Sequence, residues 1–397
     1  MNKKLNILRI VYDWPTPWNG LAPAPYYLSK AQGKLGHKVT VLTGSLGGRR
    51  LLKGKFTDLP EKNVKVVYLP RALSKHLGPF LTTSPCVLVD YIFRKLSRKK
   101  ISIVHGHGHT MLWFNIYKLL FGWLDKTPYV AHFHIVAKER KEKAIEKGEK
   151  MKFMQKYFEN PLWELADRTS VKVADACIFV SESNREKMYE YYRPKKEKLF
   201  VVESGLETEI FKTKPLNNKP IDKSGTEILC VGKIIPRKGP DILIEALKYL
   251  PPEYYVRWIG TFEDEEYFNE LKDMAENLGV EHRIIWQGYV PNSDLAVYYK
   301  NADVFAMPSQ AEGLPKVVLE SLGSGTPVIA SGFKTKGTIK GLKYFSSKAP
   351  KTVAKEIKEF VESKPIVNTK RIYDVYSWEA KAKEVDKVYE WVFEHRK

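Results

Sequence analysis

The sequence contains little cysteine. Its 397 residues include only Cys86, Cys177 and Cys230, which lie far apart in apolar stretches. They match neither a disulfide framework nor a zinc-binding pattern, so a reducing cytosol suits them best. The first residues, MNKKLNILRIVYDW, have a basic start but only a short apolar run and no small-residue cleavage site. We therefore expect a first strand there instead of a signal peptide, and a cytoplasmic protein.

The sequence also lacks an apolar run as long as a membrane-spanning helix, which needs about 20 residues. Its richest candidate, residues 111–124, is interrupted by Asn115, Lys118 and Gly122. This pattern excludes an integral membrane protein anchored by such a helix, and it leaves attachment to a membrane surface open.

The charge is unevenly distributed along the chain. Residues 1–205 hold 37 Lys and Arg against 18 Asp and Glu, a net +19, whereas residues 206–397 hold 29 and 28, a net +1. A lysine-rich surface that only keeps the protein soluble is one explanation. Because the excess is confined to one half, we expect the first domain to meet an anionic partner.

Both halves alternate apolar strand-like runs with helical runs. This alternation predicts α/β domains with parallel, doubly wound sheets, whose ligands bind at the carboxyl ends of the strands. The polar segment 212–224, which has two prolines, predicts a linker. Strands are predicted at Leu5–Val11, Lys38–Thr43, Val64–Leu69, Ile101–His105, Pro128–His134, Ala176–Val180, Ile228–Val231, Tyr255–Ile259, Ile284–Gln287, Val304–Ala306 and Thr326–Ala330. Helices are predicted at Tyr26–Leu35, Lys138–Glu159, Asp241–Tyr249, Glu265–Leu278, Lys316–Leu322 and Glu379–Phe393.

The segment Pro308–Ala330 carries the strongest functional signal. Pro315 has the fixed φ suited to a first helical position, and the following residues favour a helix with one apolar face. Gly323 and Gly325 predict the end of that helix before a short buried strand. A surface loop followed by an ordinary helix is the alternative.

Two acids in this segment are placed differently. Glu312 lies in the loop, whereas Glu320 lies in the second helical turn. The amides of Lys316 and Val317 are expected to be unpaired at the positive end of the helix, where an anion can bind. The segment therefore predicts a phosphate-binding helix start with both acids nearby.

Histidines gather after two of the predicted strands. His105, His107 and His109 alternate along one segment, and His132 and His134 alternate along the next. In extended chain this spacing puts the members of each set on one face. Neutral imidazoles can bind zinc, but no cysteine or acid joins the set at ligand spacing. Contact with a substrate at the strand ends is the interpretation we favour.

Three further segments bear on function. Lys233 and Lys238 lie in a loop between a strand and a helix, where ammonium groups can neutralise phosphates. Gly20, in the loop after the first strand, allows backbone to approach a ligand closely. The basic helix Lys138–Glu159 is either a solvated surface helix or a helix that lies on a membrane.

These motifs resemble glycosyltransferase family 4, a group of retaining enzymes of the GT-B type that use nucleotide sugars. The resemblance covers residues 5 to 392 approximately. It rests on Glu312-x7-Glu320 with its PSxxEG lead, Val231-Gly232-Lys233 with Lys238-Gly239, Gly20 ahead of Gly36-His37, Ser181-Glu182, Ser204-Gly205 with Phe211, and Ser377-Trp378.

The resemblance implies an α/β protein of two Rossmann-like, doubly wound domains that face a cleft. The first, residues 1–211, would be on the acceptor side, and the second, residues 212–378, would bind the nucleotide sugar. The helix 379–393 would pack back on the first domain.

The resemblance also implies roles for single residues. His134 would contact the donor sugar and Glu312 would bind its hydroxyls, and these two are the expected catalytic residues. Glu320 would bind the nucleotide ribose, and Gly20 would lie under the diphosphate. The remaining donor-binding residues, of which the two loop lysines hold the diphosphate, would be Lys233, Lys238, Gly313, Leu314, Lys316 and Val317.

We therefore expect a retaining, metal-independent glycosyltransferase that moves a hexose from a UDP- or GDP-linked sugar to a glycan or lipid-linked acceptor. It would need no cofactor, bind no nucleic acid, and attach peripherally to the inner, anionic face of the membrane. An Asp-x-Asp motif, usual where a metal binds the donor, is absent. The alternatives are a glycan synthase or sugar phosphorylase with a soluble acceptor, a zinc hydrolase built on the histidines, and a non-catalytic sugar-nucleotide binder.

Overall fold

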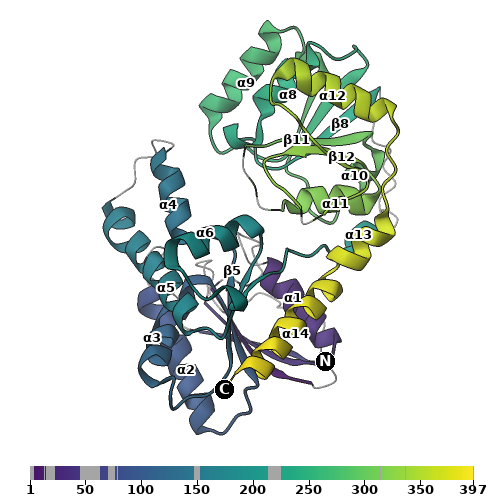
Figure 1. Cartoon of the computed structure of the whole chain (residues 1–397). Helices are drawn as coiled ribbons and strands as arrows, with labels where there is room; N and C mark the ends of the chain where they lie inside the picture. Colours follow the sequence, from purple (N-terminus) through teal and green to yellow (C-terminus); the bar gives the residue numbers. More distant parts are fainter. Residues whose placement is uncertain are drawn as a thin grey trace, which may run out of the picture. The chain divides into compact units, whose positions relative to one another are not determined.

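The computed structural model of the chain divides into two units (Figure 1). Unit 1 is Met1–Gly205 with Trp378–Lys397, and unit 2 is Leu206–Ser377. Residues 213–224 of the predicted linker lie outside the part of the chain that the structure describes. The described residues are 4–12, 14, 23–44, 63–69, 77, 79–146, 153–212, 225–310, 312, 314–335 and 337–396.

The described part of unit 1 is built on a seven-stranded parallel sheet of order β3-β2-β1-β4-β5-β6-β7. Its central strands are buried on both faces, which explains why they read as continuous apolar runs. The strands are β1 (Asn6–Val11), β2 (Lys38–Thr43), β3 (Val64–Tyr68), β4 (Ile103–His107), β5 (Tyr129–Phe133), β6 (Ala176–Phe179) and β7 (Leu199–Val201).

Helices cover both faces of this sheet. One face holds α2, α3, α5 and α6, and the other holds α1 and α14 side by side (Figure 1). The helices of unit 1 are α1 (Pro23–Lys34), α2 (Ser84–Leu96), α3 (Leu112–Phe121), α4 (Ala137–Glu146), α5 (Asn160–Val173), α6 (Glu182–Tyr192) and α14 (Trp378–His395).

The C-terminal helix α14 is fixed to unit 1 by polar contacts. Asp386 accepts a hydrogen bond from Gln32 at 2.9 Å and lies 2.9 Å from Nε2 of His37. Gly205 lies against the ring of Trp378, where a Cβ would stand 2.5 Å from the indole. The last helix therefore belongs to the core of unit 1, although the chain of unit 2 precedes it.

Unit 2 contains a six-stranded parallel sheet of order β10-β9-β8-β11-β12-β13 in its described residues. The strands are β8 (Thr226–Val231), β9 (Tyr254–Ile259), β10 (Ile284–Gly288), β11 (Val304–Pro308), β12 (Val328–Ser331) and β13 (Leu342–Tyr344). The helices are α7 (Thr208–Lys212), α8 (Pro240–Leu247), α9 (Glu265–Asn277), α10 (Leu295–Asn301), α11 (Lys316–Ser324), α12 (Pro350–Glu362) and α13 (Thr369–Tyr376).

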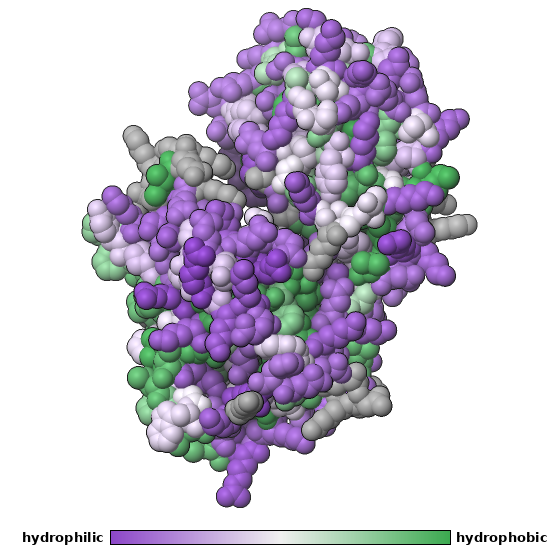
Figure 2. All heavy atoms as spheres, viewed as in Figure 1, coloured by the Kyte–Doolittle hydropathy of each residue, from purple (hydrophilic) through white to green (hydrophobic). Residues whose placement is uncertain are grey.

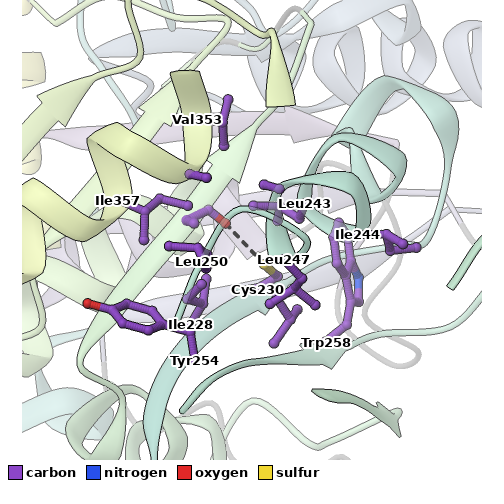
Figure 3. Packing of buried hydrophobic residues seen from close by; sticks show 14 of the residues in the cluster. Ile228, Cys230, Leu243, Ile244, Leu247, Leu250, Tyr254, Trp258, Val353 and Ile357 are labelled. Atoms are coloured by element: carbon purple, nitrogen blue, oxygen red, sulfur yellow. Dashed lines mark hydrogen bonds between the residues drawn. The ribbon is translucent and has the colours of Figure 1, made fainter. Parts of the chain in front are cut away.

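One side of the second sheet packs against α8, α9 and α12. Figure 3 shows the residues that α8 and α12 contribute to this core. Cys230 lies in this core, donates its thiol to the carbonyl of Ala306 at 3.2 Å, and is a free cysteine. Burial raises the pKa of the Cys230 thiol, so this cysteine stays a neutral packing residue. The opposite side of the sheet packs against α10, α11 and α13.

The predicted α/β class is confirmed in both units, and three local details differ from expectation. Pro315 precedes α11 with an extended ψ of 131°, so helical geometry begins at Lys316. Gly325, at φ 92°, ends α11, whereas Gly323 lies inside the helix. The predicted helix Lys138–Glu159 is described as α4 up to Glu146 and again from residue 153, and it differs from the prediction in continuing beyond Glu159 through α5 to Val173. No helix within the described ranges has the length and hydropathy of a membrane span.

Candidate functional site

In unit 2, three loops meet at the carboxyl ends of β8, β11 and β12. The amide of Gln310 donates to the carbonyl of Arg237 at 2.9 Å, and the amide of Glu312 donates to the carbonyl of Gly332 at 2.7 Å. The loop after β11 is therefore held between its two neighbours by backbone hydrogen bonds. This fixes the position from which the Glu312 side chain starts.

The loop after β8 ends at Gly239, whose φ of 70° lies in the left-handed region that favours glycine. A Cβ at this position would stand 2.7 Å from the carbonyl oxygen of Pro308 at the end of β11. Because the glycine allows the loop after β8 to approach the end of β11, the side chain of Lys238 lies next to the loop that carries Glu312. Gly239 also precedes the first residue of α8.

Glu312 binds two cations of the neighbouring loop. Its Oε1 atom lies 2.8 Å from Nζ of Lys238 and 2.5 Å from Nη1 of Arg237. The side chains of Glu312 and Lys238 are only 13% and 14% exposed. A diphosphate could share these two cations, so the cluster can bind an anion next to a carboxylate.

The two lysines predicted to hold phosphate differ in place. Lys238 belongs to the Glu312 cluster, whereas Lys233 is 58% exposed and pairs with Glu263. The structure therefore does not bring Lys233 to Glu312 in this conformation, and its contact with a diphosphate stays a prediction. Arg237 was missed by the sequence analysis, although its position beside Lys238 in a cation-rich loop could have indicated it.

The second predicted acid, Glu320, lies inside α11 in a different environment. Glu320 is 6% exposed and accepts a hydrogen bond from the hydroxyl of Tyr299 at 3.0 Å. Burial raises the pKa of this carboxyl, which the nearby Lys316 partly offsets. Lys316 also lies 3.8 Å from a carboxylate oxygen of Glu207. The two acids thus differ: Glu312 is in an ion pair, and Glu320 is buried against a phenol.

The other predicted donor-binding residues that the structure describes in unit 2 lie near the start of α11 but not in the ion-pair cluster around Glu312. Leu314 and Val317 are partly buried and pack against the core on the α11 side of the sheet. Gly313, and in unit 1 Gly20, lie outside the described residues, so their predicted contacts stay predictions.

In unit 1, four histidine rings stack at the carboxyl ends of β4 and β5. The rings of His105 and His107 stack 4.6 Å apart, and those of His132 and His134 stack 4.7 Å apart, each pair within 4° of parallel. His105 Nε2 lies 3.1 Å from His132 Nδ1. His107 Nδ1 lies 3.0 Å from His134 Nε2. Their period-two spacing therefore produces one shared face.

All four rings of this histidine stack are uncharged at neutral pH. Burial lowers the pKa of His134 to about 4 and places the pKa values of the other three well below the usual value for histidine. Repulsion from the buried Arg9 guanidinium, 3.5 Å from His105 Nδ1, acts in the same direction. The stack therefore offers neutral donors and acceptors, and His134 can hydrogen-bond a hydroxyl without carrying charge.

Nitrogen atoms of His105, His107 and His132 lie within 4.8 Å of one another, so this cluster offers donor atoms for a cation. The fit is poor on charge, because the Arg9 guanidinium lies beside it and the set of described ligand atoms contains no carboxylate. A divalent ion here would add positive charge next to a buried positive charge. The donor set thus suits hydrogen bonding better than metal binding.

A cavity of about 80 Å³, open to solvent, lies beside the stack. Its lining includes Tyr12, His109, His134, Trp163 and Asp167. The rings of His109 and Trp163 stack 4.1 Å apart. Burial raises the pKa of Asp167 to about 7, against the effect of a hydrogen bond from the amide of Ala137. This cavity combines aromatic faces with an acid that can donate or accept a proton near neutral pH.

Two of these cavity residues were not identified from the sequence. Trp163 and Asp167 lie on α5, four residues apart and therefore on one helix face. The sequence analysis ended the preceding helix at residue 159, so this face was not recognised. A helix predicted to continue through residue 173 would have placed Trp163 and Asp167 on the same face.

Two family models match adjacent parts of the chain. The model described as Glycosyltransferase Family 4 matches residues 18–210, and the model described as Glycosyl transferases group 1 matches residues 211–372. The chain belongs to the family 4-like glycosyltransferases. The histidine stack lies in the first matched segment and the Glu312 cluster in the second.

Curated relatives agree with this membership, and solved structures agree with the fold. The glycosyltransferase is 24% identical over 411 residues to a chain of the phosphatidylinositol N-acetylglucosaminyltransferase of Arabidopsis thaliana, covering 98% of this chain and 82% of that one. It is 31% identical over 180 residues to an uncharacterized glycosyltransferase of Methanocaldococcus jannaschii, covering 42% of this chain and 45% of the relative. The match thus spans less than half of that archaeal relative.

Its fold is similar to that of Anabaena HepE, solved in complex with UDP. The TM-score is 0.68 at 16% identity, with 98% of this chain and 100% of the other covered. The fold and the enzyme class predicted from the sequence, a GT-B glycosyltransferase, are confirmed.

Proposed function

We propose that this glycosyltransferase moves a hexose from a UDP- or GDP-linked sugar to a glycan or lipid-linked acceptor, with retention of configuration and without a metal ion. The observation that carries the proposal is the Glu312 cluster, in which Lys238 and Arg237 surround one carboxylate at the carboxyl end of β11. Ligands of doubly wound sheets bind at such strand ends.

The chemistry of the leaving group explains the cluster. Breaking a bond between sugar and phosphate builds negative charge on the departing nucleoside diphosphate. Lys238, Arg237 and the amino-terminal end of α11 supply positive charge at one place, which is what a metal ion would otherwise supply. Glu312 would then contact the hydroxyls of the donor sugar, and Glu320 the ribose.

The acceptor side is proposed for unit 1. His134 would contact the donor sugar as a neutral imidazole, and the cavity lined by Trp163, His109 and Asp167 would receive the acceptor. Aromatic faces pack against the apolar side of a sugar ring, while a carboxyl group binds its hydroxyls. A lipid-linked acceptor is supported by the name of the Arabidopsis relative and by the +19 charge of residues 1–205. The enzyme would work in the cytoplasm at the inner face of the membrane.

A thermal-shift screen of UDP-, GDP- and ADP-sugars tests the donor. We expect one nucleotide to raise the Tm, because a ligand that binds the native state stabilises it by mass action. Turnover in EDTA tests metal independence, and the anomeric configuration of the product, read by NMR, tests retention. Absence of any shift, loss of turnover in EDTA with recovery in Mg²⁺, or an inverted product would each contradict the corresponding part of the proposal.

A further inference from the structure

The outer side of α2 and α3 exposes many large apolar side chains. Figure 2 shows hydrophobic residues gathered over the part of unit 1 where Figure 1 places these helices. We call this set the α2–α3 surface; its residues are Leu81, Val89, Ile92, Phe93, Leu96, Trp113, Leu119, Leu120, Phe121, Trp123 and Leu124. Single exposed apolar residues are ordinary on a soluble protein, but a contiguous set of this size marks an interaction surface.

The helix α2 is apolar on two opposite sides. Val87 and Tyr91 face inward and are fully buried in the core of unit 1. Phe93 and Leu96, at 68% and 77% exposed, lie on the other side of the helix. A helix that is apolar around its circumference is expected to be covered on both sides. The core covers only the inner side of α2.

The exposed charge around this surface is mostly positive. Between Asp90 and Asp125 the chain has six Lys and Arg, of which Lys118 is buried, and no acid. Arg98, Lys99 and Lys100, directly after α2, are exposed. The two flanking acids are already engaged: Asp90 pairs with Arg94, and Asp125 lies 3.3 Å from Nζ of Lys95. The rim of the α2–α3 surface is therefore basic.

An apolar surface with a basic rim indicates which kind of partner covers it. A second copy of the chain would bring two basic rims together, and like charges disfavour that pairing. An anionic phospholipid bilayer offers hydrocarbon for Leu, Phe and Trp and negative headgroups for Lys and Arg. Aromatic residues flanked by basic ones are the composition typical of segments that lie in a membrane interface.

The basic helix α4, expected from the sequence to meet the membrane, is less suited to it. The Arg140 guanidinium lies 4.6 Å from the centre of the Trp163 ring. Lys141 pairs with Glu164 at 2.8 Å, and Lys138 lies 4.6 Å from the Tyr191 ring. These three cations, of which Arg140 is itself exposed, are in contact with side chains of unit 1.

One end of the α2–α3 surface, at Trp113, lies near the proposed acceptor cavity. The helix α3 packs against both α2 and α5. Trp163 of α5 lines the cavity and packs against a small core formed by Phe80, Leu112 and Ala166. Trp113, next to Leu112, belongs to the exposed surface and donates its indole N–H to the carbonyl of Phe80 at 2.9 Å.

We propose that the α2–α3 surface inserts its apolar side chains into an anionic phospholipid bilayer, with the basic residues after α2 on the headgroups, so that a lipid-linked acceptor reaches the cavity beside Trp163. The proposal rests on the proposed function for the acceptor class, but the binding surface itself is a separate claim. It differs from purely electrostatic attachment because part of the binding should survive high salt.

Co-sedimentation of the full chain with vesicles tests the surface. We use phosphatidylcholine alone and an equal mixture with phosphatidylglycerol, each at low and high salt. We expect the wild type to bind the anionic vesicles and to keep a residual fraction at high salt. The triple variant Phe93→Gln, Leu96→Gln, Leu120→Gln should bind at least about ten-fold more weakly, because it removes inserted carbon atoms. Lys99→Gln with Lys100→Gln should lower only the salt-sensitive part.

Matched control variants are available in unit 2. Tyr289 and Ile366 are 75% and 69% exposed, and their replacement by Gln should leave vesicle binding unchanged. The Tm and the donor-induced shift, measured without vesicles, show whether a variant is folded and whether the proposed donor chemistry holds. An absent donor shift contradicts the proposed function alone.

Three results would overturn the membrane surface itself. The wild type could fail to bind anionic vesicles, or the triple variant could bind as well as the wild type. Sedimentation velocity could instead show a dimer that the triple variant dissolves, which would assign the surface to a second copy of the chain.

Discussion

The Glu312→Gln variant is predicted to bind a bare nucleoside diphosphate more tightly while losing turnover. In the structure, Glu312 holds the two cations that a diphosphate needs, so the carboxylate and the phosphates compete for them. Removing the negative charge ends this competition. Turnover should nevertheless fall, because the same carboxylate is proposed to bind the hydroxyls of the donor sugar.

The magnitude follows from the geometry. At 2.8 Å, the attraction between Lys238 and Glu312 is roughly 6 kcal/mol before desolvation, for an effective dielectric constant of about 20. Most of this is offset by the cost of removing both groups from water. A gain of only about 1.4 kcal/mol for the diphosphate would tighten its Kd ten-fold. We expect at least this gain, together with a loss of about 100-fold in kcat.

Isothermal titration with UDP or GDP, whichever raises the Tm of the wild type, measures the affinity. The matched control is Glu263→Gln, which frees Lys233 in an exposed ion pair and should change the Kd little. Equal or weaker binding of the nucleotide by Glu312→Gln would refute the competition. An unchanged kcat would remove Glu312 from the catalytic residues.

Four further variants test other groups. Lys238→Ala should lower kcat/KM about 100-fold, whereas Lys233→Ala, in an exposed pair, should lower it far less; equal losses would contradict the contrast. Glu320→Gln removes a buried carboxyl, and burial raises the pKa of that carboxyl, so the Tm at neutral pH should stay the same or rise. The variant should bind the donor more weakly, with a similar kcat. A lowered Tm would contradict this reasoning. Asp167→Asn should flatten the pH dependence of the free energy of unfolding. The pKa of Asp167 is about 7 in the native state, so the native protein keeps a proton that the unfolded chain releases near pH 4. The wild type therefore loses up to roughly 4 kcal/mol of stability between pH 4 and pH 7, and the variant should be the more stable of the two near pH 8. Parallel thermal melts from pH 4 to 8 would contradict the assignment.

Strand and helix order could be predicted from the sequence because most of the core strands are continuous apolar runs. Lys38–Thr43 was placed at its observed bounds, and the strand predicted at Val304–Ala306 is the start of β11. The helix predicted at 138–159 was ended too early, because helical structure continues beyond Glu159 through α5 to Val173. Composition does not show that Trp163 and Asp167 continue the helical face further along the chain.

The kinds of residue in the candidate site could be predicted from the sequence, but not which of these side chains contact one another. A lysine or arginine anywhere in the loop after β8 can point toward phosphate, and the sequence analysis chose Lys233 and Lys238 but not Arg237. The choice is made by Gly239, whose left-handed backbone lets the end of the loop approach β11. Lys238 and Arg237 stand directly before this glycine, so they reach Glu312, while Lys233 at the start of the loop pairs with Glu263 instead. In this site the backbone conformation at one glycine therefore decides which of three similar cations meets the carboxylate.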